Sequence, residues 1–336
     1  MESLLMRPGK KRLPSRMVPL TVFAPASIGN MSVGFDALGL ALAPLDGSLL
    51  GDLVKLSDPG AGSASQDWAL EVTGTFGSKL PDDQEKNIVI ACCRGFQQAA
   101  TIKGVNIKPL KVMLEKRLPI GSGLGSSASS VVAALEALNR WHRNPLSHHD
   151  IFQLMAEMEG RISGEIHLDN IAPCLYGGLR LCPPSSGSEF ALPWPIKWHV
   201  VVCWPGTELI TREARSVLPE QIPRKTAVRY GAQFAQFVHA LHTGNTKLAA
   251  ASVVDHIAEP YRSPLLPGFD QAKQELQKLG ALAVGISGSG PSIFALVDEL
   301  EIADQAASWL AENYQKNEQG FVHICRADLG GARSIE

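Results

Sequence analysis

The feature that most constrains this chain is a glycine-rich stretch at residues 119–130, Pro-Ile-Gly-Ser-Gly-Leu-Gly-Ser-Ser-Ala-Ser-Ser. Glycine lets the backbone adopt turns that a Cβ would block, and lets it approach a ligand closely. An apolar pattern of helical period begins directly after the last glycine. Because the first N–H groups of a helix lack internal partners and carry partial positive charge, this stretch predicts an anion site, most often for phosphate.

Two common phosphate loops do not match this stretch. A Walker A loop needs G-x-x-x-x-G-K-[ST], but Ser126 and Ser127 follow Gly125 with no lysine. A Rossmann fingerprint needs a third glycine where Ser126 stands and a parallel strand next, whereas a second helical pattern follows at 147–159. We therefore set both classes aside.

Length and composition narrow the class of protein. The 336 residues suit one large domain or two medium ones. With 45% apolar and 19% charged residues, the composition is that of a soluble globular protein. A net charge of −2 argues against nucleic acid as a partner, and no apolar run approaches the roughly 18 residues of a membrane span. We expect neither nucleic acid nor a membrane as partner.

The N-terminus and the cysteines indicate the compartment. Residues 1–16 are basic but lack the apolar segment of a secretory signal, so we expect a flexible basic tail. The six cysteines form no C-x-x-C pair, which is typical of reduced thiols in a cytoplasmic protein. Cys92, Cys174 and Cys203 have apolar neighbours and are expected in the core.

Hydrophobic periodicity predicts helices mixed with antiparallel-capable strands, hence an α+β protein. A Pro- and Ser-rich connection at 183–195 marks a boundary between an N-terminal domain, 17–185, and a C-terminal domain, 186–336. The predicted helices include 87–100, 226–242, 246–257 and 269–279, and one that starts at Ser147 and ends at Gly160. The predicted strands include 18–23, 105–114, 198–204, 281–286 and 292–297.

Several polar residues are candidates for chemistry. Asp36 stands in a loop of small residues before an apolar run, where it is either a ligand or a turn former. Glu159 lies beside the apolar stripe of its helix, where a carboxylate is costly unless it is paired, hydrogen-bonded or metal-bound. An exposed helix-end glutamate is the alternative. His167, Asp169 and Asn170 form a cluster after that helix.

These motifs together carry a family resemblance. Residues 119–128 resemble the signature loop of the GHMP small-molecule kinases, which include galactokinase, homoserine kinase, mevalonate kinase and phosphomevalonate kinase. Four further stretches resemble the homoserine kinases of this family: 30–36, 167–170, 259–262 and 288–291. The resemblance runs in order from about residue 18 to the C-terminus. One departure is Ile28-Gly29, where the family usually has a Ser-Ala pair, and it affects a minor loop contact.

The resemblance implies both a fold and a reaction. The fold would be a ribosomal-S5-like ATP-binding domain followed by a ferredoxin-like α/β domain. The reaction would transfer the γ-phosphoryl group of ATP to the hydroxyl of L-homoserine, in threonine biosynthesis from aspartate. ATP and Mg²⁺ would be the cofactors, and family habit implies a homodimer.

The nucleotide half of the site follows from the same resemblance. By the family pattern, Ser127 and Glu159 would hold Mg²⁺, a hard cation that takes oxygen ligands. Asn87 would lie near the adenine. The triphosphate would be wrapped by Pro119, Ile120, Gly121, Ser122, Gly123, Leu124, Gly125, Ser126, Ser127, Ala128 and Ser129.

The acceptor is a zwitterion, so it needs an acid for its ammonium and a cation for its carboxylate. Asp36 and Asp169, with Asn30, suit the ammonium and hydroxyl end. Arg215 and Arg262 suit the carboxylate, because guanidinium binds carboxylate through two hydrogen bonds. By resemblance, three further residues would contact the acceptor: His167, Thr211 and Gly288.

The sequence is compatible with two acceptors for the hydroxyl proton, Asp169 and the phosphate itself. Asp169 or Asn170 lies where related kinases place a catalytic aspartate, and Ser127 completes the predicted catalytic set. Asparagine cannot take the proton, so it passes to Asp169 or directly to the phosphate.

The sequence argues against two other functions. A kinase for another alcohol, such as mevalonate, would leave Asp36 without a charged partner on the acceptor. A catalytically silent ATP-binding regulator predicts a damaged glycine loop or the loss of Glu159, and the sequence has neither.

Overall fold

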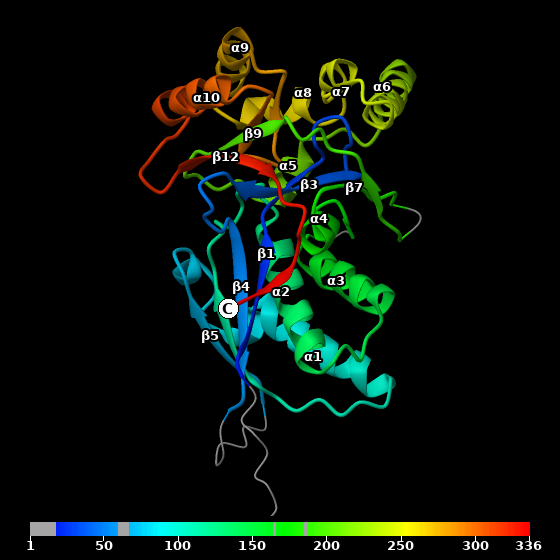
Figure 1. Ribbon diagram of the computed structural model, residues 1–336, viewed down its shortest axis with the longest axis vertical. Helices are drawn as coiled ribbons and strands as arrows, with labels where there is room; N and C mark the ends of the chain where they lie inside the picture. The colour runs from blue at the N-terminus through cyan, green and yellow to red at the C-terminus, as the bar shows by residue number, and fades with distance from the viewer. Residues whose placement is uncertain (1–17, 60–66, 164–165, 185–186) are drawn as a thin grey trace, which may run out of the picture.

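The computed structural model describes residues 18–59, 67–163, 166–184 and 187–336. The predicted basic tail at 1–16 lies outside the described residues. Figure 1 shows two layers stacked along the long axis, each with its own sheet and helices. The predicted two-domain α+β class is confirmed. No helix of the described ranges has the length and apolarity needed to cross a membrane.

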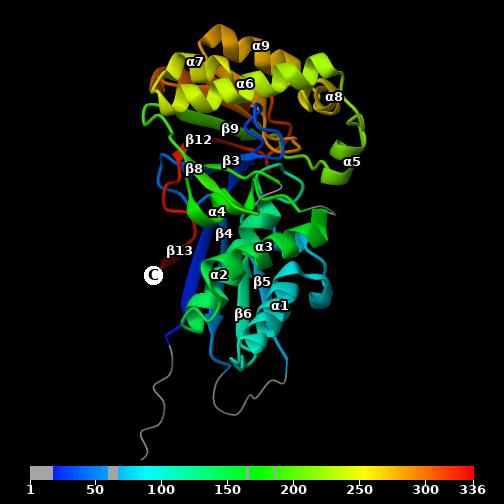
Figure 2. The ribbon, with the colours of Figure 1, turned by 90° about the vertical axis from the view of Figure 1, so that its right-hand side faces the viewer.

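The first layer is built on a five-stranded sheet in the order β13-β1-β4-β6-β5, antiparallel except between β5 and β6. Its strands are β1 (Leu20–Pro25), β4 (Gly51–Ser57), β5 (Ala69–Thr73), β6 (Lys111–Glu115) and β13 (Arg333–Ile335). One face is covered by α1 (Ile88–Ile102), α2 (Ser126–Trp141) and α3 (His148–Ser163) (Figure 2).

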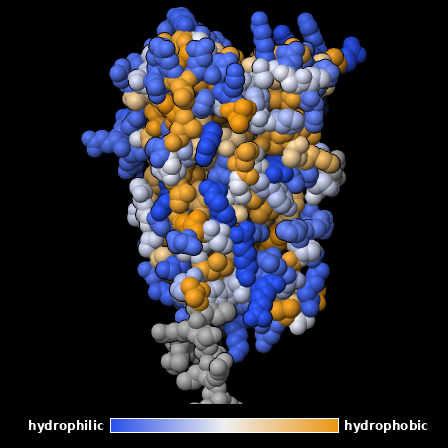
Figure 3. Space-filling model, viewed as in Figure 1, coloured by the Kyte–Doolittle hydropathy of each residue, from blue (hydrophilic) through white to orange (hydrophobic). Residues whose placement is uncertain are grey.

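Alternation along these strands separates the two faces of the sheet. Val54 and Val112 pack into the core under the helices, whereas Lys55 and Lys111 point the other way. Figure 3 shows hydrophilic residues mixed with hydrophobic ones over the part of the molecule where Figure 1 draws the front of this sheet. The sheet therefore needs helices on one side only.

The second layer is built on an eight-stranded sheet in the order β10-β11-β9-β12-β3-β7-β8, with β2 also paired to β3. Its strands are β2 (Ser27–Gly29), β3 (Leu38–Pro44), β7 (Leu179–Leu181), β8 (Phe190–Leu192), β9 (His199–Trp204), β10 (Ala283–Ile286), β11 (Ile293–Val297) and β12 (Phe321–Ala327). The neighbouring helices are α4 (Ile171–Tyr176), α5 (Thr211–Ser216), α6 (Arg224–His242), α7 (Thr246–Ala251), α8 (Glu259–Arg262), α9 (Phe269–Leu279) and α10 (Leu300–Asn313).

Strand β9 shows how this sheet is packed. Val200 and Val202 belong to a core cluster with α6 and α7, whereas Val201 and Cys203 belong to one with α9 and α10. This period of two is that of a strand buried on both faces.

The two layers exchange strands. Strands β2, β3 and β7 precede the predicted domain boundary but complete the second sheet, and β13 returns from the C-terminus to pair with β1. The predicted boundary between residues 185 and 186 falls just before β8, and it stays a prediction.

Some predicted element ends are wrong. Helix α3 continues past Gly160 to Ser163, because an interior glycine costs only about 1 kcal/mol and α3 packs on α1 and α2. The predicted strand 105–114 begins only at Lys111, after Pro109, which has no N–H to donate. The predicted helix 246–257 ends at Ala251. All six cysteines are buried and free, as predicted for Cys92, Cys174 and Cys203.

A buried ion pair fixes both ends of the glycine-rich loop. Asp52 of β4 is fully buried, and its carboxylate accepts hydrogen bonds from the Lys116 ammonium, the Ser130 hydroxyl (2.6 Å) and the backbone N–H of Leu118 (3.0 Å). The Lys116 ammonium also donates to the carbonyl of Ser126 (2.8 Å). Because Lys116 and Leu118 precede the loop while Ser126 and Ser130 follow it, one carboxylate ties its entry to its exit.

We expect Asp52→Ala to lower the free energy of unfolding by about 3–5 kcal/mol, because Lys116 would be left buried without a counter-ion. Chemical denaturation followed by circular dichroism measures this change. The control is Glu71→Ala, which removes an exposed partner of Lys111 and should leave the midpoint near that of the wild type. Equal midpoints for the two variants would contradict the structural role of Asp52.

Candidate active site

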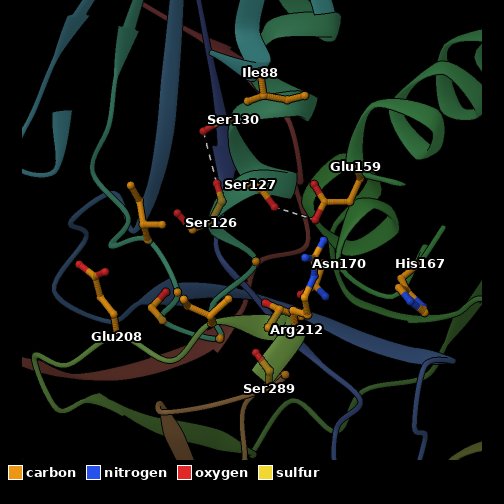
Figure 4. Close-up of a pocket in the computed structure, with 18 of the residues that line it drawn as sticks. Ile88, Ser126, Ser127, Ser130, Glu159, His167, Asn170, Glu208, Arg212 and Ser289 are labelled. Atoms are coloured by element: carbon orange, nitrogen blue, oxygen red, sulfur yellow. Dashed lines mark hydrogen bonds between the residues drawn. The ribbon is translucent and has the colours of Figure 1, made fainter. Parts of the chain in front are cut away.

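A cavity of about 720 Å³ brings together residues of both layers, and its size is that of a small-molecule site (Figure 4). Most of the predicted site residues line it: Asn30, Asp36, Asn87, Ile120, Gly121, Ser122, Gly123, Gly125, Ser126, Ser127, Glu159, His167, Asp169, Asn170, Thr211, Arg215, Arg262 and Gly288. Four predicted loop residues do not line it: Pro119, Leu124, Ala128 and Ser129. The last three are fully buried.

The loop requires glycine at alternate positions for two reasons. Gly121, Gly123 and Gly125 have φ values of 60°, 79° and 64°, in the left-handed region. A Cβ at Gly123 would lie 2.3 Å from the carbonyl oxygen of Ser287, and one at Gly125 would lie 2.2 Å from Ser27 Oγ. Helix α2 begins immediately after Gly125, so its first N–H groups lie at this loop, as predicted.

A second glycine turn, 287–291, packs directly on the first. The Ser287 hydroxyl donates to the carbonyl of Gly123 (2.7 Å), and the backbone N–H of Ser292 donates to the carbonyl of Ser122 (3.1 Å). The N–H of Gly288 reaches the carbonyl of Gly29 (3.2 Å). The cavity is therefore framed by backbone of three segments far apart in the sequence.

Ser127 and Glu159 face each other across α2 and α3 (Figure 4), and the Ser127 hydroxyl donates to Glu159 Oε1 (2.6 Å). Burial raises the pKa of Glu159, and the Ser127 hydrogen bond opposes that rise. Glu159 is thus not the exposed helix-end residue of the alternative interpretation. Its oxygens and Ser127 Oγ are the ligand type that Mg²⁺ prefers.

The described residues contain no group of three or more His, Cys, Asp or Glu side chains placed to hold a metal. Mg²⁺ in kinase sites is commonly bound by one or two carboxylates together with substrate phosphates. The Ser127–Glu159 pair at the start of α2 fits that incomplete kind of site.

Asp36 and Arg215 lie in direct contact. Arg215 donates to both carboxylate oxygens of Asp36, at 3.0 and 3.3 Å, and His167 Nδ1 lies 3.7 Å from Asp36 Oδ1. The backbone N–H of Asp36 donates to Asn30 Oδ1 (2.8 Å), and Asp36 itself has a left-handed backbone with a φ of 54°. Two residues predicted for opposite ends of an acceptor therefore form a pair within the protein.

Asp169 is buried, with 3% of its surface exposed. Burial, followed by the nearby charge of Asp36, raises its pKa to about 7, and Arg215 opposes that rise. The backbone N–H of Asn30 donates to this carboxyl group. Gly29 leaves the room that it needs, since a Cβ there would lie 2.6 Å from Asp169 Oδ2.

Asn170 lies beside Asp169, and its Oδ1 accepts a hydrogen bond from the Ser27 hydroxyl (2.9 Å). A Cβ at Gly29 would also lie 2.7 Å from Asn170 Nδ2. A side chain at position 29 would therefore crowd both Asp169 and Asn170.

Arg262 is buried against backbone rather than against an acid. Its Nε donates to the carbonyl of Ala214 (3.1 Å), its Nη1 donates to the carbonyl of Gly288 (2.9 Å), and the Phe35 ring lies 5.6 Å from its guanidinium. Asn30 Nδ2 donates to the same Gly288 carbonyl (3.0 Å). Burial, then the charge of Arg215, lowers the pKa of Arg262.

Asn87 lies at the other end of the cavity. Its Oδ1 caps α1 through the N–H of Val89 (2.9 Å), while its buried Nδ2 has no hydrogen-bond partner among the described residues. A donor in this state is available to a ligand atom.

Sequence reasoning missed several residues that line the cavity: Lys86, Lys116, Ser130, Glu208, Arg212 and Ser289. Lys116 stands in a run of three consecutive charged residues, 115–117, which is typical of a solvated segment. Its position three residues before Pro119 was the sequence feature that could have placed it near the glycine-rich loop.

Comparisons with known proteins match both parts of the chain. The model described as GHMP kinases N terminal domain matches residues 87–178, and the one described as GHMP kinases C terminal matches residues 237–316. The crystal structure of homoserine kinase from Cytophaga hutchinsonii has a TM-score of 0.84 and 33% identity, over 99% of this chain and 100% of that one.

More distant structures share the fold alone. The Lin0012 protein of Listeria innocua has a TM-score of 0.72 at 18% identity, over 95% of this chain and 100% of that one. L. major mevalonate kinase, in complex with R-mevalonate, has a TM-score of 0.64 at 17% identity, over 93% and 96%.

We expect Gly123→Ala to lower the free energy of unfolding by about 1–3 kcal/mol more than Gly104→Ala, because only the first adds a clash. Gly104 is the matched control, since its φ of 81° is close to the 79° of Gly123 and nothing lies within 4 Å of an added Cβ. Thermal and chemical unfolding measure the difference. Equal losses would mean that the contact with Ser287 does not constrain the loop.

Proposed function

This chain belongs to the GHMP kinase family of phosphotransferases, and we propose that it transfers the γ-phosphoryl group of ATP to the hydroxyl of L-homoserine. One observation carries the proposal: paired acidic and basic side chains share a cavity with the glycine loop. The product would be O-phospho-L-homoserine, an intermediate of threonine biosynthesis. We further propose a cytoplasmic homodimer.

The charges at the acceptor end favour a zwitterion. Asp36 offers a carboxylate for an ammonium group, while Arg215 and Arg262 offer guanidinium groups for a carboxylate. An acceptor with a carboxylate but no ammonium, such as mevalonate, would leave Asp36 without a charged partner on the acceptor. The similarity to the Cytophaga homoserine kinase supports the same choice.

The nucleotide end suits ATP. The loop and the first N–H groups of α2 are donors for the phosphates, and Asn87 Nδ2 is a donor for an acceptor atom of the base. Ser127 and Glu159 would hold Mg²⁺, which when bound neutralises phosphate charge.

Asp169 is the group that we propose for the proton. The acceptor oxygen forms a bond to the γ-phosphorus while the bond from that phosphorus to the β–γ bridging oxygen breaks, and Asp169 takes the hydroxyl proton. A pKa of about 7 leaves a large fraction of Asp169 ionised at neutral pH, which suits a general base. The N–H of Asn30 orients the carboxylate, and Asn170, held by Ser27, packs beside it.

The proposal is tested by ADP release from ATP and Mg²⁺ with homoserine, threonine, serine and mevalonate as acceptors. We expect the highest kcat/KM for homoserine, because it alone combines the zwitterion with a primary hydroxyl one carbon beyond that of serine. A preference for mevalonate would identify a related kinase instead. Absence of turnover with every alcohol would favour an ATP-binding regulator.

The pH profile tests the role of Asp169. Because its base form predominates only above a pKa of about 7, kcat/KM should fall about tenfold per pH unit below that value. Asp36→Asn removes a charge that raises this pKa, so its acid limb should move to lower pH. Asp169→Asn should lose roughly 10²–10⁴-fold in kcat. Near-normal kcat in Asp169→Asn would indicate direct proton transfer to the phosphate.

A further inference from the structure

The cavity contains cations that are already committed to partners in the protein. The Lys116 ammonium uses its three donors on Asp52, Ser126 and Ser130. Arg215 is bound through two nitrogens to Asp36, and Arg262 is buried against two backbone carbonyls. A triphosphate in the glycine loop brings several negative charges close to these side chains, and none of the three can turn toward it without losing one of these contacts.

Arg212 differs from these cations. It lines the same cavity, its side chain is exposed, and the described residues give it neither an ion pair nor a hydrogen bond. Lys86 is also exposed, but it lies beside Asn87 at the other end of the cavity and 3.7 Å from Asp83. Arg212 is therefore a cation with unused donors at the end where the acceptor residues gather.

Helix α5 determines the direction of Arg212. Positions 212 and 215 are three residues apart and lie on the same side of a helix. Because Arg215 is held on Asp36 inside the cavity, that side of α5 faces the cavity. Figure 4 draws Arg212 and Ser289 on one wall of the cavity, across from Ser127 and Glu159.

The segment before α5 is fastened to the glycine loop. The N–H of Leu209 donates to the carbonyl of Gly121 (2.9 Å), and Trp204 Nε1 donates to the carbonyl of Thr207 (2.8 Å). Arg212 follows Leu209 by three residues, which limits their backbone separation to about 10 Å. Its long side chain thus starts close to the loop, on the same helix as Thr211 and Arg215.

We propose that Arg212 is a further catalytic residue, whose guanidinium contacts the γ-phosphoryl group as it passes from ATP to the acceptor. This inference rests on the proposed kinase activity. Arg212 forms and breaks no covalent bond in the step described above. It supplies positive charge and two directed N–H groups where the equatorial oxygens of the transferring group develop charge.

The test compares Arg212→Gln, Arg212→Lys and a control, Arg224→Gln, with the wild type. Arg224 is an exposed arginine at the start of α6, and it does not line the cavity. We expect Arg212→Gln to lower kcat roughly 10²-fold, since removal of one transition-state donor has that effect. Arg212→Lys should recover part of the loss, because it keeps the charge without the planar fork, and Arg224→Gln should match the wild type.

Nucleotide binding separates the two proposals. Isothermal titration with Mg²⁺ should show that Arg212→Gln binds a non-hydrolysable ATP analogue roughly 10-fold more weakly than the wild type but binds ADP equally well. Unchanged kcat, or equal weakening for the analogue and ADP, would overturn the role of Arg212. A wild type that binds neither nucleotide would instead overturn the proposed function.

Discussion

The contact between Asp52 and Lys116 is the constraint on which the site depends. A chain of glycines and serines is intrinsically mobile, and it becomes a defined phosphate cradle only if both of its ends are fixed. The buried carboxylate of Asp52 binds the residues before the loop and, through Lys116 and Ser130, the first turn of α2. Because an unpaired charge is costly in the interior, loss of either side chain would destabilise the contacts at both ends of the loop.

The second constraint joins the two layers. The turn at 287–291 lies on the glycine loop through Ser287, and the Gly288 carbonyl accepts hydrogen bonds from both Asn30 and Arg262. The residues proposed for the acceptor are therefore held against the same backbone that forms the phosphate loop. Because the layers also exchange strands, this contact is supported by the sheets around it.

Features that depend on neighbouring residues in the sequence, such as amphipathic helices, were predictable from the sequence. Helices α1, α6 and α9 were predictable from their 3.6-residue period, and Glu159 was singled out by its place beside an apolar stripe. The ion pair of Asp52 and Lys116 was not, because Asp52 lies in β4, Lys116 lies just after β6, and no local signal links positions 64 residues apart. The same reason applies to the strand exchange and to Arg212, whose partner would be a ligand rather than another part of the chain.

The charge balance of the cavity explains why its pKa values shift in opposite directions. Burial disfavours the ionised form of every group, so it raises the pKa of Asp169 and Glu159 and lowers that of Arg262. Backbone groups stabilise the charged forms of both residues: two carbonyls accept hydrogen bonds from Arg262, and the N–H of Asn30 donates to Asp169. The negative charge of Asp36 opposes this effect at Asp169 by repulsion. A zwitterionic acceptor whose ammonium binds Asp36 would weaken that repulsion and lower the pKa of Asp169. Binding of the acceptor would thereby favour the ionised carboxylate at the moment when a proton must be taken from the hydroxyl.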